Sequence, residues 1–188
     1  MLGTQELNRR SARHVSGFTL VELMVTVTVA SVLMAIAVPS FNDMMVSSRV
    51  STQANEIVAA INFARSEAIK RNTSMALCRA SGPAATVCTS PQTGNWQHWI
   101  VRPVSPAGAA VVRRGVVNEF SNAIAVESNL TGDQVVFGPD GLARTGGVVV
   151  NDQRINVCST RSSDASARRR VVLGAGSRLF TESFTEDC

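Results

Sequence analysis

The sequence has few side chains suited to catalysis. It contains two histidines among 188 residues, and only His98 lies beyond the first 17. That residue stands between two tryptophans in a run that predicts a strand. No serine nucleophile elbow, H-E-x-x-H motif or phosphate-binding loop accompanies it. We therefore expect no enzyme activity.

The sequence also lacks the usual metal and nucleotide motifs. Its four cysteines form no C-x-x-C pair and no Cys/His cluster, which argues against zinc or a redox motif. Asp133, Asp140, Asp152 and Asp164 do not have the spacing of a calcium loop. The segment 174–176 is a lone G-x-G, which favours a turn over a nucleotide site. We expect no metal and no cofactor.

One long apolar run stands near the N-terminus. Residues 18–38 carry a single charge, Glu22. At about 1.5 Å per residue this run would give about 31 Å of helix, which is enough to cross a bilayer and contact lipid. A carboxylate inside a membrane helix costs about 2.5–3.5 kcal/mol at the centre and less near an end, so Glu22 calls for a function.

Arginines precede this run and none follows it closely. Arg9, Arg10 and Arg13 lie before it, and the next basic residue is Arg49. The positive-inside rule then places the N-terminus in the cytoplasm and the rest of the chain outside.

The residues around this junction match a known signal. Gly17-Phe18-Thr19-Leu20-Val21-Glu22 resembles the processing site of type IV pilins and of type II secretion pseudopilins. The resemblance implies that residues 1–17 are a class III leader, removed after Gly17 by a prepilin peptidase that then methylates Phe18. It also implies that Glu22 pairs with the N-terminal ammonium of a neighbouring subunit, a charge pair whose loss leaves one buried charge uncompensated.

Two other interpretations of the run stay open. The first is a secretory signal cleaved after Ala35-Ile36-Ala37, which would release a soluble protein beginning at Val38. The run is longer than the 7–15 residues typical of such a signal. The second is a plain single-span anchor with Glu22 at the membrane interface.

A second helical pattern follows the apolar run. Pro39 favours a bend over an end, and apolar residues then recur every three or four positions. They are Val50, Ala54, Ile57, Val58, Ile61, Ala64, Ala68 and Ile69. We expect one N-terminal helix over 18–72, with a transmembrane part over 18–38 and an amphipathic part after it.

From residue 73 to 188 the pattern changes to short β-prone runs separated by Gly, Pro, Asn and Ser. These runs are 75–78, 96–101, 110–113, 135–137, 148–150, 154–158 and 169–173. The predicted fold class is α+β, a long N-terminal α-helix packed on a C-terminal antiparallel β-domain. The segments 94–101 and 137–143 resemble the two signatures of the GspH/FimT group of minor pilins and pseudopilins.

Cys78, Cys88, Cys158 and Cys188 all lie in the part predicted to be exported, so disulfides are the expected state. Sequence alone permits three pairings. We favour Cys78 with Cys88 and Cys158 with Cys188, the second of which would hold the C-terminus and stabilise the domain by about 3–4 kcal/mol.

Arginines concentrate in the C-terminal part and suggest a phosphate-binding patch, with Arg168, Arg170 and Arg178 as candidates for binding DNA. Some FimT-type minor pilins are DNA receptors through a C-terminal Gly-Arg-x-Arg element. Here Gly176-Ser177-Arg178-Leu179-Phe180 supplies one of the two arginines. The alternative is that these arginines are solvated strand-face residues with some salt bridges to Glu182, Glu186 and Asp187.

The resemblance as a whole implies a minor pilin of a type IV pilus, held in the bacterial inner membrane with a periplasmic C-terminal domain until it enters the fibre. There it would prime assembly or lie at the tip. Its implied partners are the prepilin peptidase, other minor and major pilins, the inner-membrane assembly platform and lipid around 18–38. The alternatives are the minor pseudopilin H of a type II secretion system and a DNA receptor.

Overall fold

The computed structural model describes residues 17–89, 95–105, 109–117, 123–160 and 165–186, without the side chains of residues 37–40 and 166. The chain divides into two compact units, residues 1–40 and 41–188. Helix α1 (Leu20–Arg71) contributes to both units, and Pro39 does not end it.

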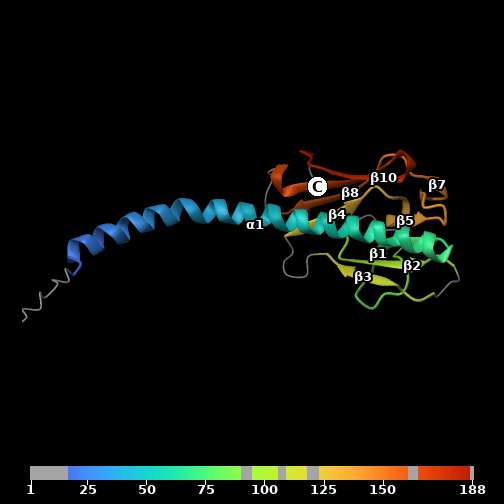
Figure 1. Cartoon of the computed structure of the whole chain (residues 1–188), viewed down its shortest axis with the longest axis horizontal. Helices are drawn as coiled ribbons and strands as arrows, with labels where there is room; N and C mark the ends of the chain where they lie inside the picture. Colours follow the sequence, from blue (N-terminus) through green and yellow to red (C-terminus); the bar gives the residue numbers. More distant parts are fainter. Residues whose placement is uncertain (1–16, 90–94, 106–108, 118–122, 161–164, 187–188) are drawn as a thin grey trace, which may run out of the picture. The chain divides into compact units, whose positions relative to one another are not determined.

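The second unit contains two antiparallel sheets (Figure 1). In the described residues the larger sheet has six strands in the order β3-β2-β1-β5-β6-β7. These are β1 (Met75–Ala80), β2 (His98–Pro103), β3 (Arg113–Val116), β5 (Gln134–Phe137), β6 (Ala143–Thr145) and β7 (Val148–Val149).

The smaller sheet has four described strands in the order β10-β9-β8-β4. These are β4 (Ile124–Ser128), β8 (Gln153–Ser159), β9 (Arg168–Gly174) and β10 (Arg178–Glu182). The described part of the domain also has three short 3-10 turns, η1 (Thr131–Asp133), η2 (Ala165–Ala167) and η3 (Ala175–Ser177). The predicted α+β class, one long helix with an antiparallel β-domain, is confirmed.

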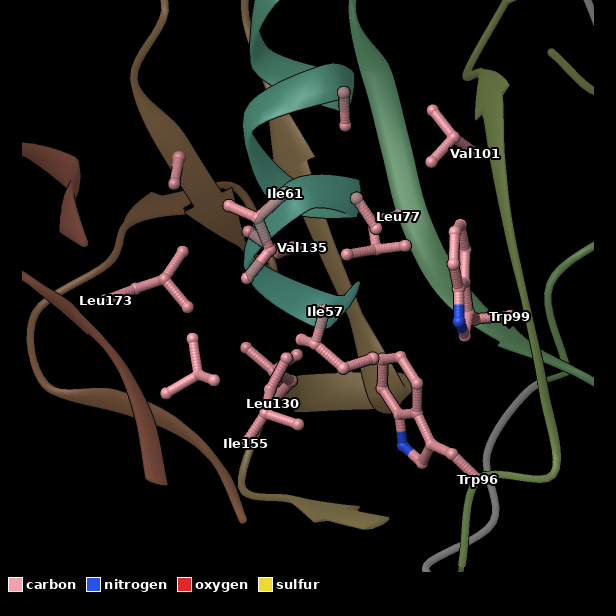
Figure 2. Packing of buried hydrophobic residues seen from close by; sticks show 14 of the residues in the cluster. Ile57, Ile61, Leu77, Trp96, Trp99, Val101, Leu130, Val135, Ile155 and Leu173 are labelled. Atoms are coloured by element: carbon pink, nitrogen blue, oxygen red, sulfur yellow. The ribbon is translucent and has the colours of Figure 1, made fainter. Parts of the chain in front are cut away.

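The β-domain packs around the second part of α1. In the view of Figure 1, β1 to β3 lie on one side of this helical segment and β8 and β10 on the other. The helix buries the predicted stripe at positions such as Val50, Ile57 and Ile61. Figure 2 shows Ile57 and Ile61 among side chains of both sheets, including Leu77 and Leu173. One core therefore joins the helix to both sheets.

A glycine on the edge strand β3 makes room for the largest core side chain of β2. A Cβ on Gly115 would lie 2.1 Å from two carbons of the Trp99 indole. Trp99 is 1% exposed, so the ring has no space to move away.

Candidate processing and assembly site

The Gly17–Phe18 junction is an accessible, non-helical segment. Residues 17–19 precede α1, and a Cβ added at Gly17 would meet no atom within 4 Å. The Phe18 side chain is 83% exposed. A protease needs an uncovered, non-helical chain at the bond it cleaves, and residues 17–19 meet this condition.

Thr19 and Glu22 begin the helix together. The backbone N–H of Glu22 donates to Thr19 Oγ1 at 3.2 Å, and Thr19 directly precedes the first helical residue, Leu20. This is the N-terminal half of a capping box, in which a threonine at the cap satisfies a free N–H of the first turn. A carboxylate in the first turn also interacts favourably with the helix dipole.

Within the described part of the chain, the Glu22 carboxylate has no hydrogen bond or ion pair, and its side chain is exposed. The structure thus leaves this carboxylate available to a group from outside the chain.

The helix that follows is apolar on all sides and uncovered. Its exposed large side chains are Leu20, Val21, Leu23, Met24, Val25, Val27, Val29, Val32, Leu33, Met34 and Ile36. It is the one helix in the described residues that is long and apolar enough to cross a membrane. A helix that is apolar all round requires an apolar environment, either lipid or other helices.

The few hydroxyl groups on this helix are satisfied internally. Thr26, Thr28 and Ser31 donate to the carbonyls of Leu23, Met24 and Thr28 at 2.7–2.9 Å. Such bonds remove the need for water, which is the condition for placing polar side chains in a bilayer.

Two of the three arginines predicted to bind DNA are buried in the β-domain. Arg168 and Arg170 share one strand face and are 6% and 7% exposed, so the expectation of solvated strand-face residues is wrong for these two. The Arg168 guanidinium donates to the carbonyl oxygens of Thr185 and Glu186. Arg168 therefore contacts the chain's own C-terminal segment.

Arg170 makes the larger set of contacts. Its Nε donates to Asn156 Oδ1 at 3.0 Å, and its guanidinium pairs with Glu186 and, at 3.8 Å, with Glu182. It also lies 4.4 Å from the ring centroid of Phe184. The pKa of Glu186 is lowered, first because Arg170 donates a hydrogen bond to it.

Of the three candidates, Arg178 alone is exposed. DNA binding through Arg168, Arg170 and Arg178 stays a prediction, and two of its three residues are committed to internal contacts.

Sequence reasoning missed a buried polar cluster around Asp133. This aspartate is 5% exposed and accepts hydrogen bonds from Arg79 Nε at 2.8 Å, Ser128 Oγ at 2.7 Å and Trp96 Nε1 at 3.2 Å. Arg79 belongs to β1 of the larger sheet and Ser128 to β4 of the smaller. Asp133 has φ of 49°, and an aspartate tolerates this left-handed conformation better than most residues. The cluster ties the two sheets together.

Two of the four cysteines are joined to each other. Cys78 and Cys88 form a disulfide with Cα atoms 5.6 Å apart, as predicted. Cys158 is also disulfide-bonded. Cys188 lies outside the described residues, so its pairing with Cys158 stays a prediction.

An exposed Gly17–Phe18 segment, a long apolar helix and an α+β fold define the class of type IV pilin-like proteins. The profile of the prokaryotic N-terminal methylation motif matches residues 12–38, which contain the Gly17–Phe18 junction. The profile of the family described as type II transport protein GspH matches residues 53–177. This match covers well over half of the 188 residues, and the chain belongs to the GspH family.

A solved structure of this class shares the fold. The crystal structure of the type IV minor pilin FimU of Pseudomonas aeruginosa is 14% identical with a TM-score of 0.52, over 72% of this chain and 89% of that one. The minor pseudopilin EpsH of the Vibrio cholerae type 2 secretion system is 9% identical with a TM-score of 0.48, over 72% of this chain and 97% of that one. Comparison with curated proteins gives no match.

Proposed function

We propose that this protein is a minor pilin of a type IV pilus, a structural subunit without catalytic activity. It is held in the inner membrane by residues 18–38, cleaved after Gly17, N-methylated on Phe18 and then incorporated to prime the fibre or form its tip. The observation that carries the proposal is the uncovered apolar helix, with Glu22 as its one charge, directly after an accessible Gly17–Phe18 bond.

The charges and disulfides support the orientation that the proposal needs. Arg9, Arg10 and Arg13 favour a cytoplasmic N-terminus. The Cys78–Cys88 disulfide fits an oxidising compartment such as the periplasm for the β-domain. The partners in this account are the prepilin peptidase, the inner-membrane assembly platform and the helices of neighbouring pilins.

Glu22 has a specific role in this account. Its carboxylate pairs with the N-terminal ammonium of the adjacent subunit and fixes the position of the incoming helix. Because both charges are then removed from water, losing one partner costs about 3–5 kcal/mol.

A matched pair of variants tests this role in cells that make the fibre. Glu22→Gln and Asp43→Asn each remove one negative charge from an exposed position of α1. Glu22→Gln should be processed and stay in the membrane, while its amount in sheared fibres falls by more than about tenfold. Asp43→Asn should enter the fibres normally. Equal incorporation of the two variants would overturn the assigned role of Glu22.

The second candidate is a minor pseudopilin H of a type II secretion system, which the GspH family match favours directly. Deleting the gene distinguishes the two functions, because a different process should fail in each case. A pilus subunit is needed for surface fibres, whereas a pseudopilin is needed for export of folded proteins across the outer membrane.

A further inference from the structure

A cleft with a volume of about 250 Å³ lies beside the edge of the larger sheet. Its lining includes His98 and Ile100 of β2 together with Arg114 and Val116 of β3. These four are cross-strand neighbours on one face, since His98 pairs with Val116 and Ile100 with Arg114. The alternate β2 residues Trp99 and Val101 pack in the core with α1, whereas Ile100 packs in a separate cluster with Cys78 and Ala80. The cleft therefore opens on the sheet face away from the helix.

The opposite wall of the cleft is held in place. It is formed by Gly82 and Pro83, within the loop that the Cys78–Cys88 disulfide closes. Arg114 Nη1 donates to the carbonyl of Pro83 at 3.2 Å and to that of Ala85. The cleft is thus formed before any partner binds, which lowers the ordering cost of binding.

The strand beside the cleft has a free edge. β3 is the last strand of its sheet and pairs only with β2 among the described strands. The Val117 N–H donates to the carbonyl of Gln97, on the side of β2. Along an antiparallel strand, backbone groups that bond to one neighbouring strand occur at every second residue. The backbone N–H and C=O groups of Arg114 and Val116 consequently face away from β2, and an added strand can pair with them.

The charges around the cleft select the partner. Among the described residues, its two ionisable lining residues are His98 and Arg114, and none of the lining residues is acidic. The neighbouring Arg113 lies on the opposite face of the sheet, with its guanidinium 5.3 Å from the ring centroid of Phe63 and 5.8 Å from that of Trp99. Two copies of β3 paired edge to edge would bring the Arg114 side chain of each copy onto one sheet face, where like charges repel. The partner is therefore a different, acidic chain.

We propose that β3 and this cleft receive an extended acidic segment of another subunit of the fibre. The segment adds to β3 as a strand, inserts one apolar side chain between Pro83, Ile100 and Val116, and places carboxylates beside Arg114 and His98. Backbone pairing at a sheet edge gives affinity in this mode, and the side-chain pocket gives specificity. This inference names a contact of the proposed pilin and rests on that function.

The test uses two blocked peptides with the full-length protein in detergent micelles. Glu-Thr-Val-Thr-Glu places two carboxylates and one valine on a single strand face, and Lys-Thr-Val-Thr-Lys keeps the shape with the opposite charge. Amide hydrogen exchange of residues 113–116 should slow with the acidic peptide and remain unchanged with the basic one. Added salt should weaken the effect. Equal effects of both peptides, or slower exchange at β7 or β10 instead, would contradict the proposal.

Backbone pairing is tested separately. An acidic peptide with N-methyl groups on alternate amides keeps its side chains but cannot complete the ladder, and should bind at least about tenfold more weakly. Val116→Pro, which removes an outward-facing N–H at an edge position, should have the same effect, with Val149→Pro on β7, the strand at the other end of the sheet, as its control. If the N-methylated peptide binds as well as the parent, or if the protein crosslinks to itself through β3, the proposal is wrong. None of these readouts depends on leader cleavage or fibre formation, so a failure here leaves the proposed function standing.

Discussion

The indole Nε1 of Trp96 donates a hydrogen bond to Asp133 Oδ1 at 3.2 Å, and both side chains are buried. The residues are 37 positions apart in the sequence. This contact places Trp96 at the junction of the two sheets, where Arg79 and Ser128 donate hydrogen bonds to the same carboxylate.

Replacing Asp133 should destabilise the β-domain strongly. Asp133→Ala leaves the Arg79 guanidinium and the indole N–H buried without this acceptor, and breaking a buried ion pair costs about 3–5 kcal/mol. Urea unfolding followed by tryptophan fluorescence measures the loss. The control is Asp152→Asn, which removes a solvent-exposed pair with Arg154 while keeping a residue type suited to the φ of 62° there, and should change stability little. A midpoint for Asp133→Ala equal to that of the control would disprove the structural role of the cluster.

Gly115→Ala should destabilise the domain through overpacking. The new methyl group would lie 2.1 Å from the Trp99 ring, and inserting a carbon into a packed core costs about 1–3 kcal/mol. Gly82→Ala serves as the control because a Cβ there meets nothing within 4 Å. Gly115→Ala should have a clearly lower melting temperature than Gly82→Ala in thermal unfolding. Similar melting temperatures would mean that Trp99 does not pack over Gly115.

Stability should fall in acid as Asp140 is protonated. The hydrogen bond from Arg144, followed by that from the Leu142 backbone, lowers the pKa of Asp140 from 3.8 to about 2. A carboxyl with a lowered folded-state pKa stabilises the fold fully above its ordinary pKa, and this contribution is lost as the pH falls toward about 2. Asp140→Asn and Arg144→Gln should each reduce the pH dependence of unfolding between about 4 and 2. If both variants kept the same loss of stability between about pH 4 and 2, the Asp140–Arg144 pair would not be its cause.

The C-terminal segment should loosen when Arg170 is replaced. Arg170→Ala removes the pairs with Glu182 and Glu186 and the ring contact with Phe184. Amide exchange over residues 184–186 should accelerate by about tenfold or more as local opening becomes easier. Arg178→Ala, at an exposed position, should leave this exchange unaltered. Equal exchange in the two variants would show that Arg170 does not hold the segment.

The sequence was sufficient for the features that follow from local pattern. The apolar run, the helical stripe through Ile57 and Ile61, and the Cys78–Cys88 pair depend on residues close together in the chain. Strand positions were predicted less well where charge obscures the pattern. β10 was missed because its segment, Arg178–Glu182, is mostly polar and lies at an exposed edge.

The arginine contacts could not be predicted for a different reason. Alternation along β9 places Arg168 and Arg170 on one face, but it does not say which face the chain later covers. Phe184 and Glu186 of the C-terminal segment lie over that face and contact Arg170. The Asp133 cluster was likewise hidden, since its members come from four separate segments.

The most direct test of the account is the intact mass and N-terminal sequence of the protein from its native membrane, with and without the prepilin peptidase. We expect a chain that begins with N-methylated Phe18 when the peptidase is present and an uncut precursor when it is absent. A mature chain beginning at Val38, or one beginning at Met1 in both strains, would contradict it.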